Sequence, residues 1–133
     1  MRKALKAWKM VVVFKYPLLL MGLIFLLSSV SMNNGARTPE YLIRFDPAFQ
    51  NLLHIPVYGF LCYLFLDALD RISVRRVSAV IIALTASFAY GCVDEVHQAF
   101  VPGRYGDTLD IALNFSGSVA GALAYCGIYC KGE

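Results

Sequence analysis

Four long apolar runs constrain this chain more than any other feature. They lie near residues 11–30, 51–69, 77–93 and 111–128, and polar connections separate them. As α-helices rising about 1.5 Å per residue, the runs would each be about 25–30 Å long, close to the thickness of a bilayer core. Apolar residues follow one another without alternation, which favours helices over strands. The sequence therefore predicts an all-α membrane protein with four transmembrane helices.

The composition supports this prediction and limits the domain count. Of the 133 residues, 59% are hydrophobic and 16% are charged, whereas soluble domains have about 25% charged residues. The length leaves no room for a separate soluble domain, so we expect a single transmembrane domain over residues 1–133. Its helices are expected at about residues 11–30, 51–69, 77–98 and 110–128.

The basic residues predict the orientation of these helices. They concentrate at the amino end, between the second and third helices, and at the carboxyl end: Arg2, Lys3, Lys6, Lys9, Lys15, Arg71, Arg75, Arg76 and Lys131. The positive-inside rule then places both termini in the cytoplasm of a cell whose inner (cytoplasmic) membrane the chain crosses several times. A net charge of +3 is read as this topology signal, and we expect no nucleic-acid partner.

The first run also resembles the core of a secretory signal peptide, because basic residues precede it. It is longer than a typical signal core, and no convincing cleavage site follows it. We therefore expect an uncleaved first helix.

The densest polar stretch lies where the third helix ends. It runs from Asp94 to Arg104, and Asp110 and Asn114 follow at the start of the fourth helix. The predicted orientation places this stretch, the connection 31–50 and the start of the second helix with His54 on the outer side. Polar side chains at the edge of a membrane segment are costly and usually mark a functional site. We therefore expect a polar extracytoplasmic site.

One hypothesis for this site is catalytic. If the third helix continues through Gln98, Asp94 lies one turn from both His97 and Gln98. A neighbouring carboxylate orients an imidazole and raises its basicity, which suits general acid–base chemistry. His97 with Asp94 and Glu95 is the predicted catalytic group, and the enzyme would be a membrane-embedded hydrolase or transferase.

A second hypothesis is binding without chemistry. Arg104 could face an anionic headgroup, or it could pair with Asp94 or Glu95. The side chains expected to bind a substrate or headgroup are His54, Gln98, Arg104, Asp110 and Asn114.

A divalent metal is a third use of the same side chains, namely His54, Asp94, Glu95, His97 and Asp110. The chain has only two histidines and no HExxH motif, and local spacing does not bring these donors together. We therefore predict no metal and no other cofactor.

Small residues on the fourth helix predict close helix packing. Asp110, Asn114, Gly117 and Gly121 follow one another at spacings that place them on one face. Glycines four residues apart let another helix approach closely. This face could pack within the chain, or it could dock a membrane protein partner.

These residues resemble the VanZ-like family of small bacterial multi-helix membrane proteins. The resemblance is carried by the runs 94–98 and 100–104 and by Ser28, Ser29, His54, Asp110, Asn114, Gly117 and Gly121. The chain departs from the family where Gln50 and Asn51 replace a frequent Asp-Lys pair, and at Asp107, where a small residue is usual.

The resemblance implies a cell-envelope context and does not imply a reaction. The family takes its name from a protein associated with low-level resistance to the glycopeptide teicoplanin. The leading hypothesis is thus an envelope protein that acts on or with a lipid-linked or cell-wall headgroup and affects glycopeptide susceptibility. The alternatives are the hydrolase or transferase and a non-enzymatic partner subunit.

Overall fold

The structure is a computed structural model that describes residues 2–31, 51–104 and 106–129, with side chains from residue 12 onward. Four long helices make up most of the described chain: α1 (Arg2–Ser28), α4 (His54–Arg71), α5 (Arg76–Gln98) and α6 (Thr108–Tyr129). No strand occurs in these ranges. The prediction of an all-helical chain is confirmed. The predicted polar connection, apart from Ser31, and the basic residue Lys131 lie outside the described residues.

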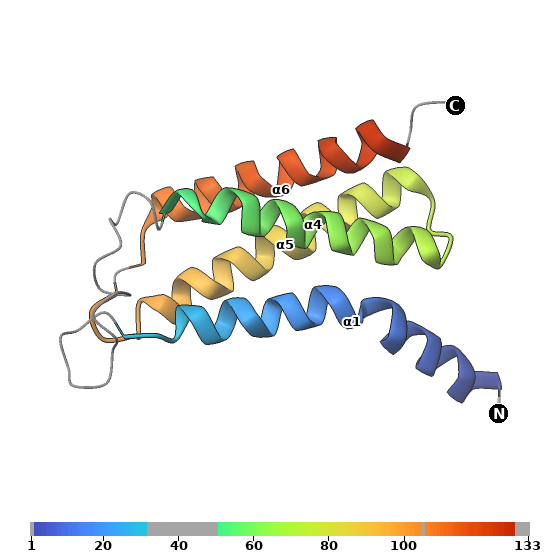
Figure 1. Ribbon diagram of the computed structural model, residues 1–133, viewed down its shortest axis with the longest axis horizontal. Helices are drawn as coiled ribbons and strands as arrows, with labels where there is room; N and C mark the ends of the chain where they lie inside the picture. Colours follow the sequence, from blue (N-terminus) through green and yellow to red (C-terminus); the bar gives the residue numbers. More distant parts are fainter. Residues whose placement is uncertain (1, 32–50, 105, 130–133) are drawn as a thin grey trace.

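The helices run alternately in opposite directions along one bundle (Figure 1). The start of α1 and the end of α6 lie at one end of it. The end of α1, the start of α4, the end of α5 and the start of α6 meet at the opposite end. The most extensive packing is between α4 and α6; α5 packs on both of them, and α1 packs on α4 and α5. Polar residues that are distant in sequence are thereby collected at one end of the bundle.

The helix bounds differ from those predicted at several ends. α1 already begins at Arg2, nine residues before the expected start at residue 11, because its basic segment is rich in Lys, Arg, Ala and Leu, which favour helices. α4 begins at His54 and continues to Arg71, so it is shifted toward the carboxyl end relative to the predicted 51–69. α5 and α6 begin within two residues of their predicted starts.

Two connections fix how α4, α5 and α6 follow one another. After the last residue of α4, the amide of Ser73 donates to the Asp70 carbonyl at 2.8 Å. Ser73 itself has φ 59°, a left-handed conformation that ends helices. Ahead of α6, Asp107 Oδ1 accepts the amide of Leu109 at 2.9 Å. This is an N-cap bond, and it explains why α6 begins at Thr108.

The contact between α4 and α6 is made by backbone. A Cβ atom built on Gly121 would collide with the carbonyl oxygen of Gly59, and one built on Gly117 would collide with the carbonyl oxygen of Ile55. A Cβ on Gly59 would lie 2.9 Å from the Gly117 carbonyl oxygen. Glycine is therefore required at these positions for the two helices to come this close. Gly117 and Gly121 thus lie directly against α4 of the same chain.

The bundle is apolar outside as well as inside. The core is formed by residues such as Tyr58, Leu61, Leu66 and Ala83. Large apolar side chains also lie exposed on every helix, among them Leu19, Leu26, Phe60, Ile81, Val93, Phe115 and Leu123. Such an extensive exposed apolar surface is unusual for a soluble monomer.

Among the described residues, α5 and α6 are long and apolar enough to cross a membrane. The apolar part of α1, Val12–Ser28, is shorter than these two candidate spans. α4 carries Asp67, Asp70 and Arg71 in its last two turns, which lowers its apolar content. Two candidate spans are thus present, and four transmembrane helices remain a prediction.

Candidate functional site

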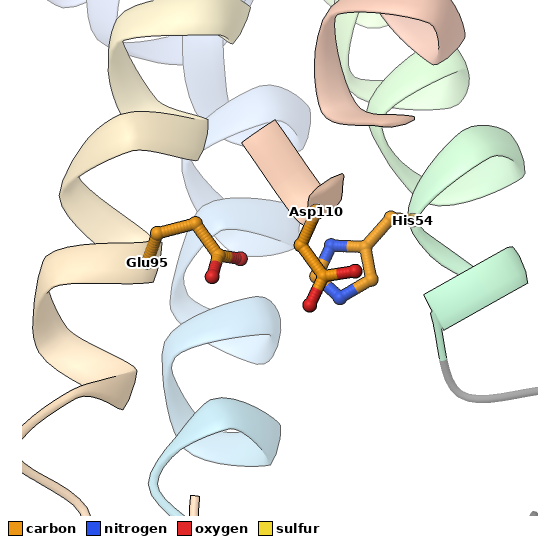
Figure 2. A group of neighbouring side chains, drawn as sticks. All are labelled: His54, Glu95 and Asp110. Carbon is orange, nitrogen blue, oxygen red and sulfur yellow. The ribbon is translucent and has the colours of Figure 1, made fainter. Parts of the chain in front are cut away.

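Three helices bring His54, Glu95 and Asp110 together at one end of the bundle. Figure 2 shows the three side chains converging from α4, α5 and α6. Each offers a nitrogen or oxygen atom, and these atoms all lie within 4.8 Å of one another. Glu95 is 4% exposed and Asp110 is 5% exposed, while His54 is half-buried. We call these three residues the acidic cluster.

The orientation of His54 is set by Asn114 on α6. His54 Nδ1 lies 2.7 Å from Asn114 Oδ1. The amide oxygen accepts, so Nδ1 carries the proton and Nε2 is left with its lone pair in the neutral imidazole. The ring of Tyr58, one turn further along α4, lies nearly parallel to the imidazole, with 6.1 Å between ring centroids.

Each of the two carboxyl groups of the acidic cluster has one oxygen atom that accepts no hydrogen bond from a described residue. Glu95 Oε2 accepts the amide of Asp107 at 3.3 Å, but Glu95 Oε1 and Asp110 Oδ1 are buried without a hydrogen-bond partner. Within the described ranges, no lysine or arginine forms an ion pair with either carboxyl. The ion pair between Arg71 and Asp67 lies near the other end of the bundle. Buried carboxyls without partners are costly, which makes this the chemically least satisfied place in the described chain.

In a second polar group, beside the acidic cluster, one carboxyl oxygen of Asp94 is hydrogen-bonded and the other, Oδ1, is buried without a partner. Asp94 Oδ2 accepts the Gln98 side-chain amide at 2.8 Å and the Tyr58 hydroxyl at 3.2 Å. Gln98 also contacts Ser28 Oγ of α1 at 3.4 Å. All four of these residues are buried. These bonds tie α1, α4 and α5 together, so Asp94 and Gln98 act as structural links in this geometry.

His97 lies apart from the carboxyls with which it was predicted to work. Its Nε2 is 2.9 Å from Ser29 Oγ, and its ring stacks on Phe25 with centroids 4.5 Å apart. No hydrogen bond or ion pair joins His97 to Asp94 or Glu95 among the described contacts. The histidine that the fold places beside carboxyls is His54.

Arg104 is held by the end of α1. One guanidinium nitrogen donates to the Ser28 carbonyl oxygen at 3.3 Å, and the side chain is half-buried. In the described part of the chain Arg104 makes no ion pair with Asp94 or Glu95. The pairing considered from sequence is therefore not formed.

The structure changes the argument about metals. The sequence prediction of no metal rested on donors that local spacing does not bring together. Tertiary packing assembles three of them, because α4, α5 and α6 each supply one. An imidazole and two carboxylates are ordinary ligands of divalent metal ions. They can equally accept hydrogen bonds from hydroxyl or amide groups of a substrate.

Several residues of this end were not predicted as site residues from sequence. Tyr58 could have been found, because it follows His54 by four residues and so shares its helix face. Asp107, noted only as a departure from the family, caps α6 and binds Glu95 through its amide. Ser28 reveals its role only through contacts between helices distant in the sequence.

The glycine face of α6 is covered by α4 of the same chain. A membrane protein partner at Gly117 and Gly121 stays a prediction, and such a partner would compete with α4 for that face.

Comparison with known proteins identifies one family. The family model described as VanZ/LLP1 matches residues 13–129, a range that includes the acidic cluster and all of α4, α5 and α6. No curated protein and no solved structure matches the chain significantly.

Proposed function

The chain belongs to the VanZ/LLP1 family, and from that premise we propose that it is an inner-membrane protein of the cell envelope whose acidic cluster engages the polar headgroup of a lipid-linked or cell-wall precursor. In this proposal all four helices cross the membrane, the termini are cytoplasmic, and the cluster lies on the outer side. Loss of the activity changes susceptibility to glycopeptides of the teicoplanin type.

The observation that carries the proposal is that polar side chains are buried inside the bundle while large apolar side chains cover its outside. Glu95, Asp110 and Asn114 are buried at one end of a bundle whose outer faces expose large apolar side chains. Family membership and two apolar helices indicate a membrane protein. In a membrane, buried carboxyls at a helix end are retained for function, because their insertion is costly.

The composition of the cluster favours a headgroup rich in hydrogen-bond donors. Ionised carboxyls only accept hydrogen bonds, and sugar hydroxyls and peptide amides donate them. Arg104 uses one guanidinium nitrogen to bind the Ser28 carbonyl oxygen and makes no ion pair with these carboxyls in the described chain. Recognition in this proposal therefore centres on Glu95 and Asp110, with His54 oriented by Asn114.

The proposal is tested by complementation in a strain that lacks the gene. Teicoplanin and vancomycin susceptibility is compared for His54→Ala, Glu95→Gln, Asp110→Asn and the wild type, with membrane levels of each variant measured. Asp67→Asn is the matched control, since this carboxyl lies near the other end of α4 and pairs with Arg71. We expect loss of complementation in the three cluster variants and none in the control. Full complementation by all three at normal membrane levels would overturn the proposal.

The rival enzyme hypothesis centres on His97 and is separated by one further variant. His97→Ala removes the contacts with Ser29 and Phe25 and leaves the acidic cluster unchanged. If His97 is a general base, this variant abolishes function as completely as His54→Ala. If the acidic cluster is the site, the loss is smaller than in the cluster variants.

A further inference from the structure

We propose that His54, Glu95 and Asp110 form a binding site for one divalent metal ion, Mn²⁺ or Zn²⁺. The metal site itself does not depend on the proposed function. Only the identity of the molecule that contacts the bound ion rests on it. Its structural basis is the convergence of three donor atoms within 4.8 Å of one another from three different helices.

The charge of the site is the first argument. Two carboxyl groups, each at least nine-tenths buried, lie close together beside the His54 ring (Figure 2). In the described chain neither has a lysine or arginine as an ion-pair partner. When both are ionised, these two carboxylates repel each other strongly, because burial reduces the solvent screening of their charges. A divalent cation neutralises both carboxylates at once.

The unused ligand atoms are the second argument. Glu95 Oε1 and Asp110 Oδ1 are buried and have no hydrogen-bond partner. Buried polar atoms in folded proteins are nearly always satisfied, and an ion-binding role is one recognised reason for an exception. These two oxygens belong to the carboxyls that share the cluster with His54; a third unpartnered carboxyl oxygen, Asp94 Oδ1, belongs to the neighbouring polar group.

The environment of His54 is the third argument. Its Nδ1 is paired with Asn114 Oδ1 at 2.7 Å, which leaves Nε2 as the nitrogen able to bind an ion. Metal-binding histidines commonly use their second nitrogen in this way, to fix the tautomer and the ring orientation. Asn114 is 0% exposed, so the orienting bond is shielded from water.

The donor set also indicates the kind of site. One imidazole and two carboxylates suit ions that accept mixed nitrogen and oxygen ligands. Three protein ligands leave at least one coordination position open, as in catalytic rather than structural zinc sites. With the proposed function, the natural occupant of that position is a hydroxyl oxygen of the headgroup.

The test uses the full-length protein purified in detergent and stripped with chelator. Mn²⁺ binding is followed by the loss of the free-ion electron paramagnetic resonance signal, and Zn²⁺ binding by competition with a chromophoric chelator. We expect one ion per chain in the wild type and in Asp67→Asn. Glu95→Gln, Asp110→Asn and His54→Gln should each weaken binding by at least about tenfold. Wild-type protein that takes up neither ion stoichiometrically would overturn the metal site.

Thermal unfolding separates loss of the site from loss of the fold. The Glu95→Gln, Asp110→Asn double variant keeps the side-chain shapes and removes the buried negative charges. We expect it to be at least as stable as the stripped wild type, and we expect added Mn²⁺ or Zn²⁺ to raise the Tm of the wild type alone. An equal metal-induced rise in the double variant would refute the assignment.

The two proposals fail differently. If the wild type binds no metal while the cluster variants lose complementation, the metal site is wrong and the headgroup site stands. If one ion binds at the cluster while the same variants complement fully, the metal site stands and the proposed function is wrong.

Discussion

His54 on α4 and Asn114 on α6 are joined by a hydrogen bond of 2.7 Å between Nδ1 and Oδ1. The bond connects residues sixty positions apart in sequence, and it leaves Nε2 as the imidazole nitrogen without this partner. The amide is fully buried, so water cannot replace it as the acceptor.

Changing Asn114 should therefore weaken metal binding without removing a ligand. Asn114→Ala leaves Nδ1 without its acceptor, and we expect a loss of about 10- to 100-fold in Mn²⁺ affinity. Asn114→Asp restores an acceptor oxygen and should recover most of the affinity. The measurement is the same Mn²⁺ titration by electron paramagnetic resonance. Equal affinities for the alanine variant and the wild type would show that this bond does not serve the site.

Adding a methyl group at Gly121 should destabilise the bundle. In Gly121→Ala the new Cβ collides with the Gly59 carbonyl oxygen, and backbone cannot move aside as a flexible side chain can. We expect a loss of about 1–3 kcal/mol in the free energy of unfolding, measured by titration with sodium dodecyl sulfate in mixed micelles.

Gly127 provides the matched control on the same helix. A Cβ there meets nothing within 4 Å, and alanine is the better helix former, so Gly127→Ala should stabilise the protein by about 0.5–1 kcal/mol. Similar effects of the two substitutions would contradict the close α4–α6 contact.

Removing the hydroxyl of Tyr58 should cost stability because Asp94 loses a buried donor. The bond measures 3.2 Å, and Asp94 Oδ1 is already without a partner. Hydrogen bonds to charged groups contribute about 1–3 kcal/mol, and we expect Tyr58→Phe to lower the free energy of unfolding within that range. Tyr63→Phe is the control, because the Tyr63 hydroxyl meets that of Tyr129 at an exposed position, and its effect should stay below about 0.5 kcal/mol.

The proposed orientation predicts opposite labelling of two connections. In a background without Cys62, Cys92, Cys126 and Cys130, Pro102→Cys and Ser73→Cys place thiols at exposed positions at opposite ends of the bundle. A membrane-impermeant maleimide should label the first variant in intact cells and the second only after permeabilisation. The reverse pattern would place the acidic cluster on the cytoplasmic side.

The helical fold and the location of the polar end could be predicted from sequence, because both depend on local patterns. Apolar runs of membrane length specify helices whatever their partners are. The polar stretch 94–104 and Asp110 stand out against those runs. The stripe from Asp110 to Gly121 also followed from spacing alone, and all four of its residues are buried.

The pairing of side chains at that end could not be predicted from sequence. Proximity along the helix suggested His97 as the partner of Asp94 and Glu95, but the helix turns His97 toward α1. His54 reaches the carboxyls only because α4 lies against α6, and that contact depends on glycines in both helices. Which histidine meets which carboxyl is thus a consequence of tertiary packing.

The glycine contact also determines which parts of the bundle can move relative to one another. Gly59 meets Gly117 and Gly121 backbone to backbone, so sliding α4 along α6 would bring backbone atoms into collision; this closely packed pair carries His54 and Asp110. Glu95 lies on α5, which packs less extensively on α4 and on α6 than those two helices pack on each other. Entry of a bulky ligand between the carboxyls would therefore proceed by displacement of α5, with the α4–α6 pair as the fixed frame.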